Sequence, residues 1–275
     1  MSPLPVTVVI PVLNEELNLP ACLDALGSAF EKVLVVDSDS TDRTCEIAEQ
    51  AGAQILQFQW NGKYPKKRNW TLGNYSFQTE WVFFLDADER VTPELVQELR
   101  RTLPDTSHAG FRISFTNWFM GRPLHHGDVF TKLPLFRVGA GAYEKFPEDS
   151  WSSLDMEVHE HPVLEGSVGT IRARIEHNDF RSLEHYLKKH AEYAEWEANR
   201  FCWLQSAGEE AWSQLTFRQR FKYRVLDKPG LGLFYFCVSY FLAFGFMDGA
   251  VGFHFARLKA YYFNRIRSQI KHKRG

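Results

Sequence analysis

Short apolar runs alternate with amphipathic stretches over the first hundred residues of the chain. The runs VTVVI, KVLVVD, AQILQF and WVFFLD are rich in β-branched and aromatic residues, which is typical of strands buried on both faces of a sheet. Each run is followed by residues at helical spacing, and this repeated alternation predicts an α/β fold with a mostly parallel central sheet. The expected helices cover residues 17–29, 42–51 and 65–75, and a fourth begins at Pro93 with Thr92 as its N-cap.

The pattern changes after Gly110 and again at Ser182. Between these points the segments GFRISFTNWFM, KLPLFRV and VGTIRARIEH predict strands joined by loops. Helical spacing resumes in SLEHYLKKHAEYAEWEANRFCWLQ, and the chain then ends in an aromatic-rich block and a basic tail. These changes predict a first domain over residues 1–180 and a helical region over residues 181–275.

Nineteen consecutive residues, from Pro229 to Met247, carry no charge. This length is close to the roughly 18 apolar residues that suggest a transmembrane helix. However, glycines and a serine interrupt the block and basic residues flank both ends, so a single crossing would place one basic flank on the unfavoured side. An in-plane or re-entrant segment avoids this cost, and a buried helix pair is the alternative. An apolar stripe in the tail also favours peripheral membrane attachment; it comprises Phe255, Leu258, Tyr262, Ile266 and Ile270.

The net charge of −2 hides an asymmetry between the two ends of the chain. Residues 216–275 contain twelve lysines and arginines against two aspartates, a net charge of +10, which leaves −12 for residues 1–215. A basic end fits either nucleic acid or an anionic membrane surface. Because this end lacks base-reading motifs and concentrates its aromatic residues in an uncharged block, we expect a membrane partner and no nucleic acid.

The four cysteines lie far apart and form no CxxC pair, so the sequence predicts neither a zinc site nor a disulfide framework. A reducing compartment fits this cysteine usage. The N-terminal residues MSPLPVTVVIPVLNEE have no basic region before a short, proline-bounded apolar run, which argues against a secretory signal. Together with the basic end, these features predict peripheral or re-entrant attachment at the cytoplasmic face of the cell's inner membrane.

Acidic and polar residues follow the predicted strands at the point where each strand ends. Asn14 and Glu15 follow the first strand, Asp37 ends the second, and Asp86 and Asp88 follow the fourth. The carboxyl ends of parallel strands line the ligand site of an open sheet, so we expect one cleft to contain all five side chains. The chain contains neither GxGxxG after the first strand nor a P-loop motif, so a divalent metal held by carboxylates would supply the counter-charge for phosphate groups.

Four motifs in the first half of the chain resemble the nucleotide-sugar-dependent glycosyltransferase family 2, whose members have the GT-A fold. They are VVIPVLNEE, VLVVDSDSTDRT, KKRNWTL and FFLDADE, in this order. The later VHEHP and the stretch from KPGLGLFYF to GFMDGAVGF resemble the branch that includes lipopolysaccharide-core glycosyltransferases. The resemblance covers nearly the whole chain. It implies a Rossmann-like GT-A catalytic domain over residues 1–180 and a helical, membrane-associating extension over residues 181–275.

The resemblance implies a role for each matching residue. Asp88 of the DxD element would bind Mg²⁺ or Mn²⁺ directly, Asp86 would lie nearer the ribose, and Asp37 would hold the nucleotide base. A guanidinium such as that of Arg68 suits a diphosphate. The family's usual DDGS is DSDS here, so a contact normally made by the second aspartate would fall to Ser38 or be absent. The implied nucleotide-sugar contacts are Pro11, Leu13, Asn14, Glu15, Asp37, Arg68, Asn69, Asp86 and Ala87.

Members of this family invert the anomeric carbon, which requires a general base on the face opposite the leaving diphosphate. The resemblance assigns this catalytic role to Glu160 in VHEHP, with His159 or His161 as a metal or phosphate contact. Glu160 belongs to a loop over residues 139–161 that is rich in Glu, Asp and His, which we call the acidic loop. Other carboxylates of this loop are alternative bases, namely Glu148, Asp149 and Glu157. The later histidines are expected to be packed or surface residues, namely His177, His185 and His190.

These features predict an inverting, metal-dependent glycosyltransferase. It would move one sugar from a nucleoside-diphosphate donor, with UDP-glucose as the default, to a membrane glycolipid such as the lipopolysaccharide core. No QxxRW element follows, which favours addition of a single sugar over polymer synthesis. Two alternatives stay open: transfer to a polyprenyl phosphate, and a non-catalytic, basic membrane-binding module.

Overall fold

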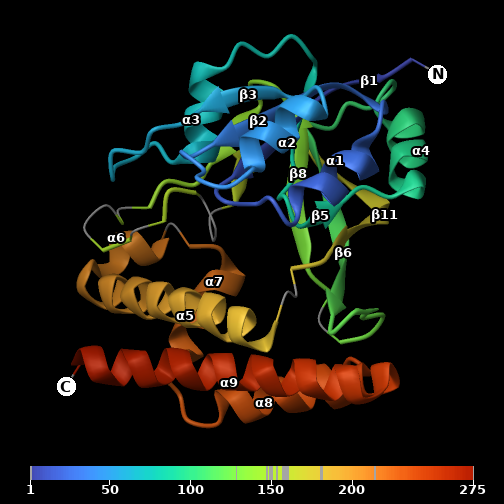
Figure 1. Ribbon diagram of the computed structural model, residues 1–275. Coiled ribbons are helices and arrows are strands. Elements are labelled where there is room, and N and C mark those ends of the chain that lie inside the picture. The colour runs from blue at the N-terminus through green and yellow to red at the C-terminus, as the bar shows by residue number, and fades with distance from the viewer. Residues whose placement is uncertain are drawn as a thin grey trace. The chain divides into compact units, whose positions relative to one another are not determined.

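The computed structural model describes residues 2–127, 129–146, 148, 151–152, 154–156, 161–179, 182–213 and 215–274 (Figure 1). These residues form two compact units. We call the first the sheet unit; it comprises the chain up to residue 117 together with residues 130–179. We call the second the helical unit; it comprises residues 118–129 together with the chain from residue 180 onward. The helical unit therefore includes a segment that lies, in the sequence, between two strands of the sheet unit.

The sheet unit is built around a sheet with the strand order β3-β2-β1-β4-β8-β6-β11-β5. β1 pairs in parallel with both β2 and β4, and β2 pairs in parallel with β3. The strand order therefore reverses between β1 and β4, which is where an open parallel sheet forms its ligand site. The predicted α/β alternation of this half is confirmed. Its strands are β1 (Leu4–Val12), β2 (Phe30–Asp37), β3 (Gln54–Gln57) and β4 (Trp81–Phe84).

Antiparallel pairing begins at β8, which lies between β4 and β6 and runs antiparallel to both. β6 pairs in parallel with β11, and β11 pairs antiparallel with β5 at the edge of the sheet. β9 and β10 form a separate two-stranded sheet, and β7 pairs with the end of β6. These strands are β5 (Glu89–Arg90), β6 (Gly110–Phe119), β7 (Arg122–Pro123), β8 (Thr131–Arg137), β9 (Gly141–Tyr143), β10 (Pro162–Leu164) and β11 (Val168–His177).

Apolar side chains cover both faces of the sheet, as the unbroken apolar runs predict. On one face, Val8 and Ile10 of β1 lie in a cluster with side chains of α1, α2 and α4. On the other face, Val9 lies in a second cluster, against which side chains of α3 pack. Each fully buried valine or isoleucine contributes about 1.5–3 kcal/mol to the stability of the fold. Because successive side chains of β1 point to opposite faces, this strand stabilises the packing of helices on both faces of the sheet. The helices are α1 (Leu19–Leu26), α2 (Thr44–Gln50), α3 (Lys67–Asn74) and α4 (Pro93–Thr102).

Local capping makes the helices shorter than the sequence pattern predicts. Gly27 follows α1 with a φ of 50°, a left-handed conformation that favours glycine and ends the helix. α2 begins at Thr44 because Asp42 accepts hydrogen bonds from both the backbone and the hydroxyl of Thr44. α4 begins as predicted, since Thr92 Oγ1 accepts a hydrogen bond from the Leu95 N–H at 3.2 Å.

In the helical unit, α5 and α8 each pack along α9 (Figure 1). Ala198 and Phe201 of α5 share a core with Ile266 and Ile270 of α9. The C-terminal part of the tail stripe therefore faces the protein interior, which corrects its interpretation as a membrane-binding surface. A helix covers a neighbouring helix with the same apolar spacing that it would use for lipid. The elements are α5 (Leu183–Ser206), α6 (Gly208–Ser213), α7 (Phe217–Val225), α8 (Leu231–Cys237), η1 (Val238–Leu242), η2 (Gly245–Asp248) and α9 (Gly249–Arg274).

The uncharged block is largely exposed, and we call its residues 231–247 the apolar segment. Where the segment bends, the backbones of Gly245 and Gly252 lie so close together that a Cβ on Gly252 would collide with the carbonyl oxygen of Gly245. Glycine at position 252 therefore permits this close approach. Asp248 fixes the end of the segment by accepting hydrogen bonds from the backbone N–H groups of His125 and His126, at 3.2 and 2.9 Å. The prediction of a buried helix pair does not hold for the outward-facing side chains. They are Leu233, Phe234, Phe241, Leu242, Phe244, Phe246 and Met247.

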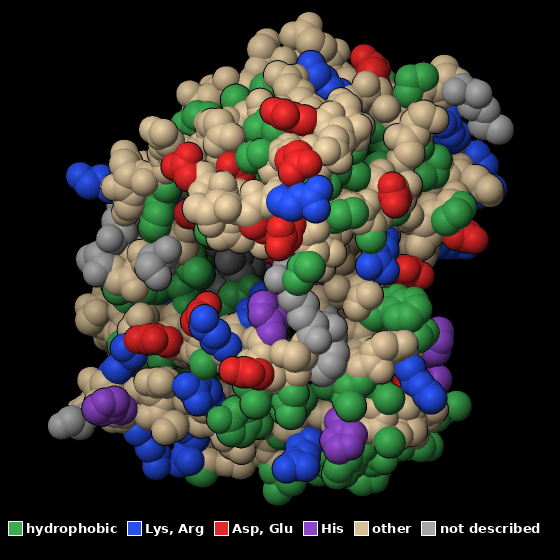
Figure 2. Space-filling view, viewed as in Figure 1, with side chains coloured by type: hydrophobic (Ala, Val, Ile, Leu, Met, Phe, Trp, Pro, Cys, Tyr) green, Lys and Arg blue, Asp and Glu red, His purple; other side chains and the backbone are tan. Residues whose placement is uncertain are grey.

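Among the described residues, no single helix has the length and hydropathy of a membrane span. Leu231–Leu242 and Gly245–Arg274 reach them only as a pair, which is bent by 75° at the break. Figure 2 shows hydrophobic side chains, with lysines and arginines between them, over the part of the surface where Figure 1 shows α8 and α9. The helical unit therefore presents a mixed apolar and basic surface.

Candidate active site

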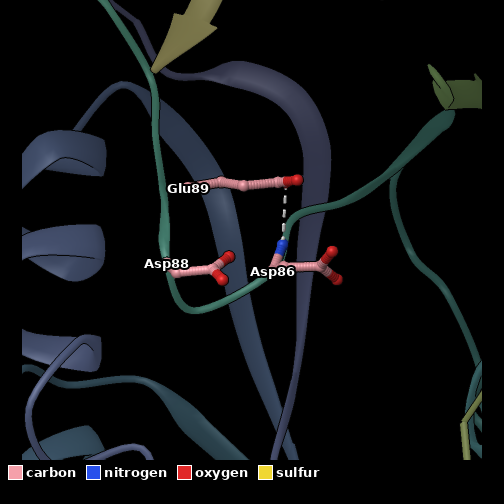
Figure 3. Close-up of side chains that lie close together, drawn as sticks. All are labelled: Asp86, Asp88 and Glu89. Carbon is pink, nitrogen blue, oxygen red and sulfur yellow. Dashed lines mark hydrogen bonds between the residues drawn. The ribbon is translucent and has the colours of Figure 1, made fainter. Parts of the chain in front are cut away.

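Three carboxylates gather in the turn that follows β4 (Figure 3). Asp86, Asp88 and Glu89 extend in the same direction, and one oxygen of each lies within 4.8 Å of the others. Glu89 Oε2 accepts a hydrogen bond from the Asp86 N–H at 3.0 Å, which closes the turn. Ala87 is buried between the two aspartates. The predicted DxD element is therefore part of a compact acidic cluster, to which the sequence analysis did not assign Glu89.

Two cationic side chains from other elements neutralise much of this charge. Arg68 Nη2 of α3 lies 2.5 Å from Asp86 Oδ1. Lys132 Nζ of β8 lies 2.6 Å from Asp86 Oδ2 and 2.5 Å from Glu89 Oε1. Burial alone would raise the pKa of Asp86, but the attraction of Lys132 and Arg68 outweighs it and holds this pKa well below its usual range. For Glu89 burial has the larger effect and raises the pKa to about 7.

His177 joins the cluster from β11, where the sequence analysis expected a packed or surface histidine. Strand pairing places it opposite Glu89 of β5 and Asn117 of β6. Its Nε2 lies 3.5 Å from Asp88 Oδ2, and its Nδ1 lies 3.0 Å from Asn117 Oδ1. Burial would lower the pKa of His177, but the Asp88 carboxylate raises it above its usual value. His177 is therefore packed, as expected, but strand pairing that is not visible in local sequence places it against Asp88.

The donor set of this cluster fits a divalent cation. Asp88 Oδ2 and His177 Nε2 are 3.5 Å apart, so both atoms can reach one ion with bonds of about 2.1 Å. In the tautomer in which His177 Nδ1 donates a hydrogen bond to Asn117 Oδ1, the Nε2 lone pair would be available to such an ion. Carboxylates suit Mg²⁺ and Mn²⁺, and an imidazole nitrogen favours Mn²⁺ of the two.

Asp37 lies at the end of β2, where loop contacts hold its carboxylate in place. The side chain is buried and accepts hydrogen bonds from the Ser40 N–H at 3.0 Å and from Ser40 Oγ at 2.5 Å. Because only β1 separates β2 from β4, Asp37 and the DxD turn lie at the same edge of the sheet, about two strand spacings or 10 Å apart. Asp37 and Asp88 therefore follow strands that end at the same edge of the sheet, and a nucleotide-sugar site shared by the two stays a prediction.

The end of β1 is fastened to the same loop. Asn14 adopts a φ of 57°, which asparagine tolerates, and its Oδ1 accepts a hydrogen bond from the Thr41 N–H at 2.8 Å. Glu15 is turned to the start of α1, where its carboxylate accepts a hydrogen bond from Asn18 Nδ2 at 2.8 Å. Pro11 is buried within β1, whereas Leu13 is 48% exposed. Nucleotide contacts by these four residues stay a prediction, and Leu13 offers the most accessible side chain.

Arg68 and Asn69, the RN pair of α3, contact different parts of the sheet unit. Arg68 faces Asp86 and lies over the Tyr143 ring at 5.3 Å. Asn69 instead fixes α3 to β9: its Oδ1 accepts from the Tyr143 N–H at 2.9 Å, and its Nδ2 donates to the Tyr143 carbonyl at 3.0 Å. Of these two residues, Arg68 is therefore the one that contacts the acidic cluster and adds positive charge to it.

Two buried lysines hold the acidic loop against the strand ends. Lys66 Nζ lies 2.5 Å from Glu148 Oε1 and both side chains are buried, which argues against Glu148 as a base facing an acceptor. Lys67 Nζ lies 3.0 Å from Asp155 Oδ2, and Ser38 Oγ donates to the same oxygen at 2.6 Å. Asp155 therefore brings a carboxylate to the position where DSDS lacks its second acidic side chain, a contact that the sequence analysis did not anticipate.

Several predicted residues fall outside the part of the chain that the structure describes. They are the proposed base Glu160, the proposed metal contact His159, and the alternative bases Glu157 and Asp149. His161 is described, and its backbone N–H donates to Glu144 Oε2 at 3.1 Å. The roles proposed for the first four residues stay predictions.

The first half of the chain is similar to known proteins. Residues 7–138 match the family model described as glycosyl transferase family 2. An uncharacterized glycosyltransferase of Rickettsia felis is 33% identical over 86 residues, which are 31% of this chain and 29% of that protein. The undecaprenyl-phosphate 4-deoxy-4-formamido-L-arabinose transferase of Pseudomonas aeruginosa is 39% identical over 114 residues, covering 36% of this chain and 33% of that protein. The chain spans only a quarter to a third of the length of such curated relatives.

Solved structures give broader but more distant matches. S. aureus TarS 1–349 covers 98% of this chain and 91% of its own, with a TM-score of 0.47 and 16% identity. Glucosyl-3-phosphoglycerate synthase from Mycobacterium tuberculosis, in complex with Mn²⁺, uridine diphosphate and glucosyl-3-phosphoglycerate, covers 42% of this chain and 44% of its own, with a TM-score of 0.31 and 24% identity. The family match includes Asp37, Asp86 and Asp88 but ends before His177.

Proposed function

We propose that this chain is a glycosyltransferase of family 2, whose model matches residues 7–138, and that it transfers one sugar from a nucleoside-diphosphate donor to a lipid-linked acceptor. Membership in a family of enzymes leaves the non-catalytic binding module without support, and we set it aside. The observation that carries the proposal is the cluster of Asp86, Asp88 and His177 at the point where the strand order reverses.

Each residue of the cluster has a proposed task. Asp88 and His177 would hold Mn²⁺ or Mg²⁺, and the bound ion would supply positive charge that stabilises the leaving diphosphate. Arg68 adds a fixed guanidinium beside Asp86, in a position suited to a phosphate oxygen. Asp37 would accept a hydrogen bond from the nucleotide base, with UDP-sugars as the favoured donors.

We retain Glu160 as the proposed catalytic base for a hydroxyl acceptor. The acceptor oxygen would form a bond to the anomeric carbon while the bond to the diphosphate breaks on the opposite face, which inverts the configuration. The hydroxyl proton would pass to Glu160, and the nucleoside diphosphate would leave with its electron pair. A membrane glycolipid such as the lipopolysaccharide core is the proposed acceptor.

The surface of the helical unit supports a membrane location. Leu242 and Leu233 are 72% and 66% exposed on the apolar segment, an arrangement that soluble surfaces rarely maintain over a contiguous patch. Exposed basic side chains lie on α7, between α7 and α8, and on α9. Near an anionic leaflet each contributes about 1 kcal/mol to binding. The exposed basic residues are Arg218, Arg220, Arg224, Lys228 and Arg257. We propose in-plane or re-entrant attachment at the cytoplasmic face of the inner membrane.

A polyprenyl phosphate is the second candidate acceptor, because the P. aeruginosa relative is named as an undecaprenyl-phosphate transferase. A phosphate oxygen is already anionic and gives up no proton when it attacks, so such a reaction needs no general base. Glu160→Gln therefore separates the two acceptors: transfer to a hydroxyl should fall by about 10²–10⁴-fold, and transfer to a phosphate should persist.

A thermal-shift screen tests the proposal directly. UDP-, GDP-, ADP- and CMP-sugars are added with and without Mn²⁺, because a ligand that binds only the folded state at a hundredfold excess over Kd stabilises it by about 2.7 kcal/mol. We expect one nucleotide class to raise the melting temperature in a Mn²⁺-dependent way. The shift should be lost in Asp88→Ala and kept in Asp24→Ala, which removes an exposed carboxylate of α1. Absence of any shift with all four classes would rule out the proposed donor site.

A further inference from the structure

Lys132 reaches the acidic cluster through the register of β8. β8 pairs antiparallel with β4, with Phe83 opposite Leu135 and Trp81 opposite Arg137. Three residues before Leu135 in β8, Lys132 pairs with Ile113 of β6 on the other side of the strand. The side chain therefore enters the turn from a rigid strand, not from a mobile loop.

The surroundings of Lys132 hold its ammonium group in one place. Its Nζ lies between Asp86 Oδ2 and Glu89 Oε1, at 2.6 and 2.5 Å. The rings of Phe115 and Phe130 lie 5.1 and 5.5 Å from the same nitrogen, a spacing that favours cation–π attraction. Two carboxylates and two aromatic rings thus surround the ammonium group.

This contact changes which carboxylate oxygens a metal ion can use. Asp86 Oδ1 binds Arg68 and Oδ2 binds Lys132. Glu89 Oε1 binds Lys132, and Oε2 accepts the Asp86 N–H. A divalent ion that used Asp86 or Glu89 would have to displace the ammonium group, whereas Asp88 and His177 lie outside these contacts.

We propose that Lys132 is a built-in cation that competes with the divalent ion for Asp86 and Glu89, and that it confines the ion to Asp88 and His177. It is a positioning residue, since it acts through the carboxylates. The inference rests on the proposed function for the presence of the ion, but its test needs neither donor nor turnover. Its direct consequence is a lower affinity for divalent metal than the three carboxylates would have alone, because like charges repel at short range.

The test compares Mn²⁺ affinities of full-length proteins by isothermal titration calorimetry and by the electron paramagnetic resonance signal of free Mn²⁺. Lys132→Met should bind Mn²⁺ at least roughly tenfold more tightly than the wild type, which corresponds to one unit of log Kd. Lys132→Gln, whose amide can still donate to both carboxylates, should show the same gain if the methionine variant folds poorly. Lys132→Arg keeps the charge and should stay near the wild-type affinity.

Lys32→Met is the matched control, because Lys32 belongs to the same sheet but lies at the start of β2, away from the strand ends. Its affinity for Mn²⁺ should equal that of the wild type. Equal or weaker binding by both Lys132→Met and Lys132→Gln would overturn the proposal, and so would absence of Mn²⁺ binding in every variant. Tighter Mn²⁺ binding without any nucleotide-sugar shift would instead support the competition and contradict the proposed function.

Discussion

The turn after β4 and the apolar segment break the usual rules of protein surfaces in opposite ways. In the turn, Glu89 is buried at 1% exposure within a sheet edge, and Lys132 offsets its charge. In the apolar segment, large hydrophobic side chains such as Phe234, at 62% exposure, face outward without charge. Buried charge and exposed apolar area both cost stability in the isolated chain. We propose a different ligand for each region: an anion with its metal for the first, and lipid for the second.

The two regions also differ in how precisely they are held. Side chains from α3, β8 and β11 converge on the turn, and hydrogen bonds fix the orientation of each. The apolar segment is held by the packing of α8 along α9 and by hydrogen bonds at Ala243 and Asp248, whereas its outward side chains are apolar. Chemistry at one atom needs fixed geometry, whereas insertion into lipid needs only area. Substitutions should therefore have sharp effects in the turn and graded effects in the segment.

The largest effect is expected from Asp88→Ala. This substitution removes the carboxylate that pairs with His177 and that we propose as a metal ligand, so the rate of nucleoside diphosphate release should fall at least about 10³-fold. The rate is measured with the donor found in the thermal-shift screen, and circular dichroism checks the fold. Asp24→Ala is the control and should retain full activity. Undiminished turnover by Asp88→Ala would remove the turn from the mechanism.

An intermediate effect is expected when two exposed side chains of the apolar segment are made polar. Phe234→Ser with Leu242→Ser should weaken binding to vesicles of phosphatidylethanolamine and phosphatidylglycerol by about a hundredfold, since each buried side chain contributes about 1.5–3 kcal/mol. Sedimentation with the vesicles measures the bound fraction. Leu17→Ser with Val163→Ser removes comparably exposed side chains from the sheet unit and should change nothing. Equal binding by both double variants would argue against insertion of the segment.

The smallest effect concerns the pH dependence of the helical unit. Burial lowers the pKa of His190 to about 4 from its usual 6.5, and its ring stacks on Tyr186 with centroids 3.8 Å apart. Because the folded pKa is depressed, the stability that neutral His190 contributes is complete above pH 6.5 and is lost as the pH falls towards about 4. The loss is on the order of 3 kcal/mol. Urea unfolding at several pH values should show a flatter profile for His190→Gln than for the wild type.

The exposed His272 of α9 supplies the control for this prediction. His272→Gln should leave the pH profile of the unfolding free energy unchanged, because an exposed imidazole has similar surroundings in the folded and unfolded chain. A profile that falls equally in the wild type and in His190→Gln would assign the acid sensitivity to other groups.

Three features follow from the amino-acid sequence alone: the strands of the first half, the position of Asp37, Asp86 and Asp88 at their carboxyl ends, and the uncharged block of residues 229–247. Each follows from local physics: burial sets the apolar runs, and parallel strands end at the same edge. It also indicated Thr92 as a cap, because that hydrogen bond spans only three residues.

The side chains that contact these carboxylates, and the surfaces that cover the apolar residues, depend on the tertiary structure. His177 and Lys132 reach the carboxylates through the pairing of β11 and β8, across 40 residues or more of sequence, and local spacing carries no record of that pairing. The sequence pattern likewise shows that the tail stripe and the apolar segment are both hydrophobic, but it does not show which of the two is buried in the core. Ile266 and Ile270 turned inward because α5 lies against them, while the apolar segment stayed exposed. Hydrophobicity is a property of a residue, but burial is a property of its neighbours, and the fold alone supplies those.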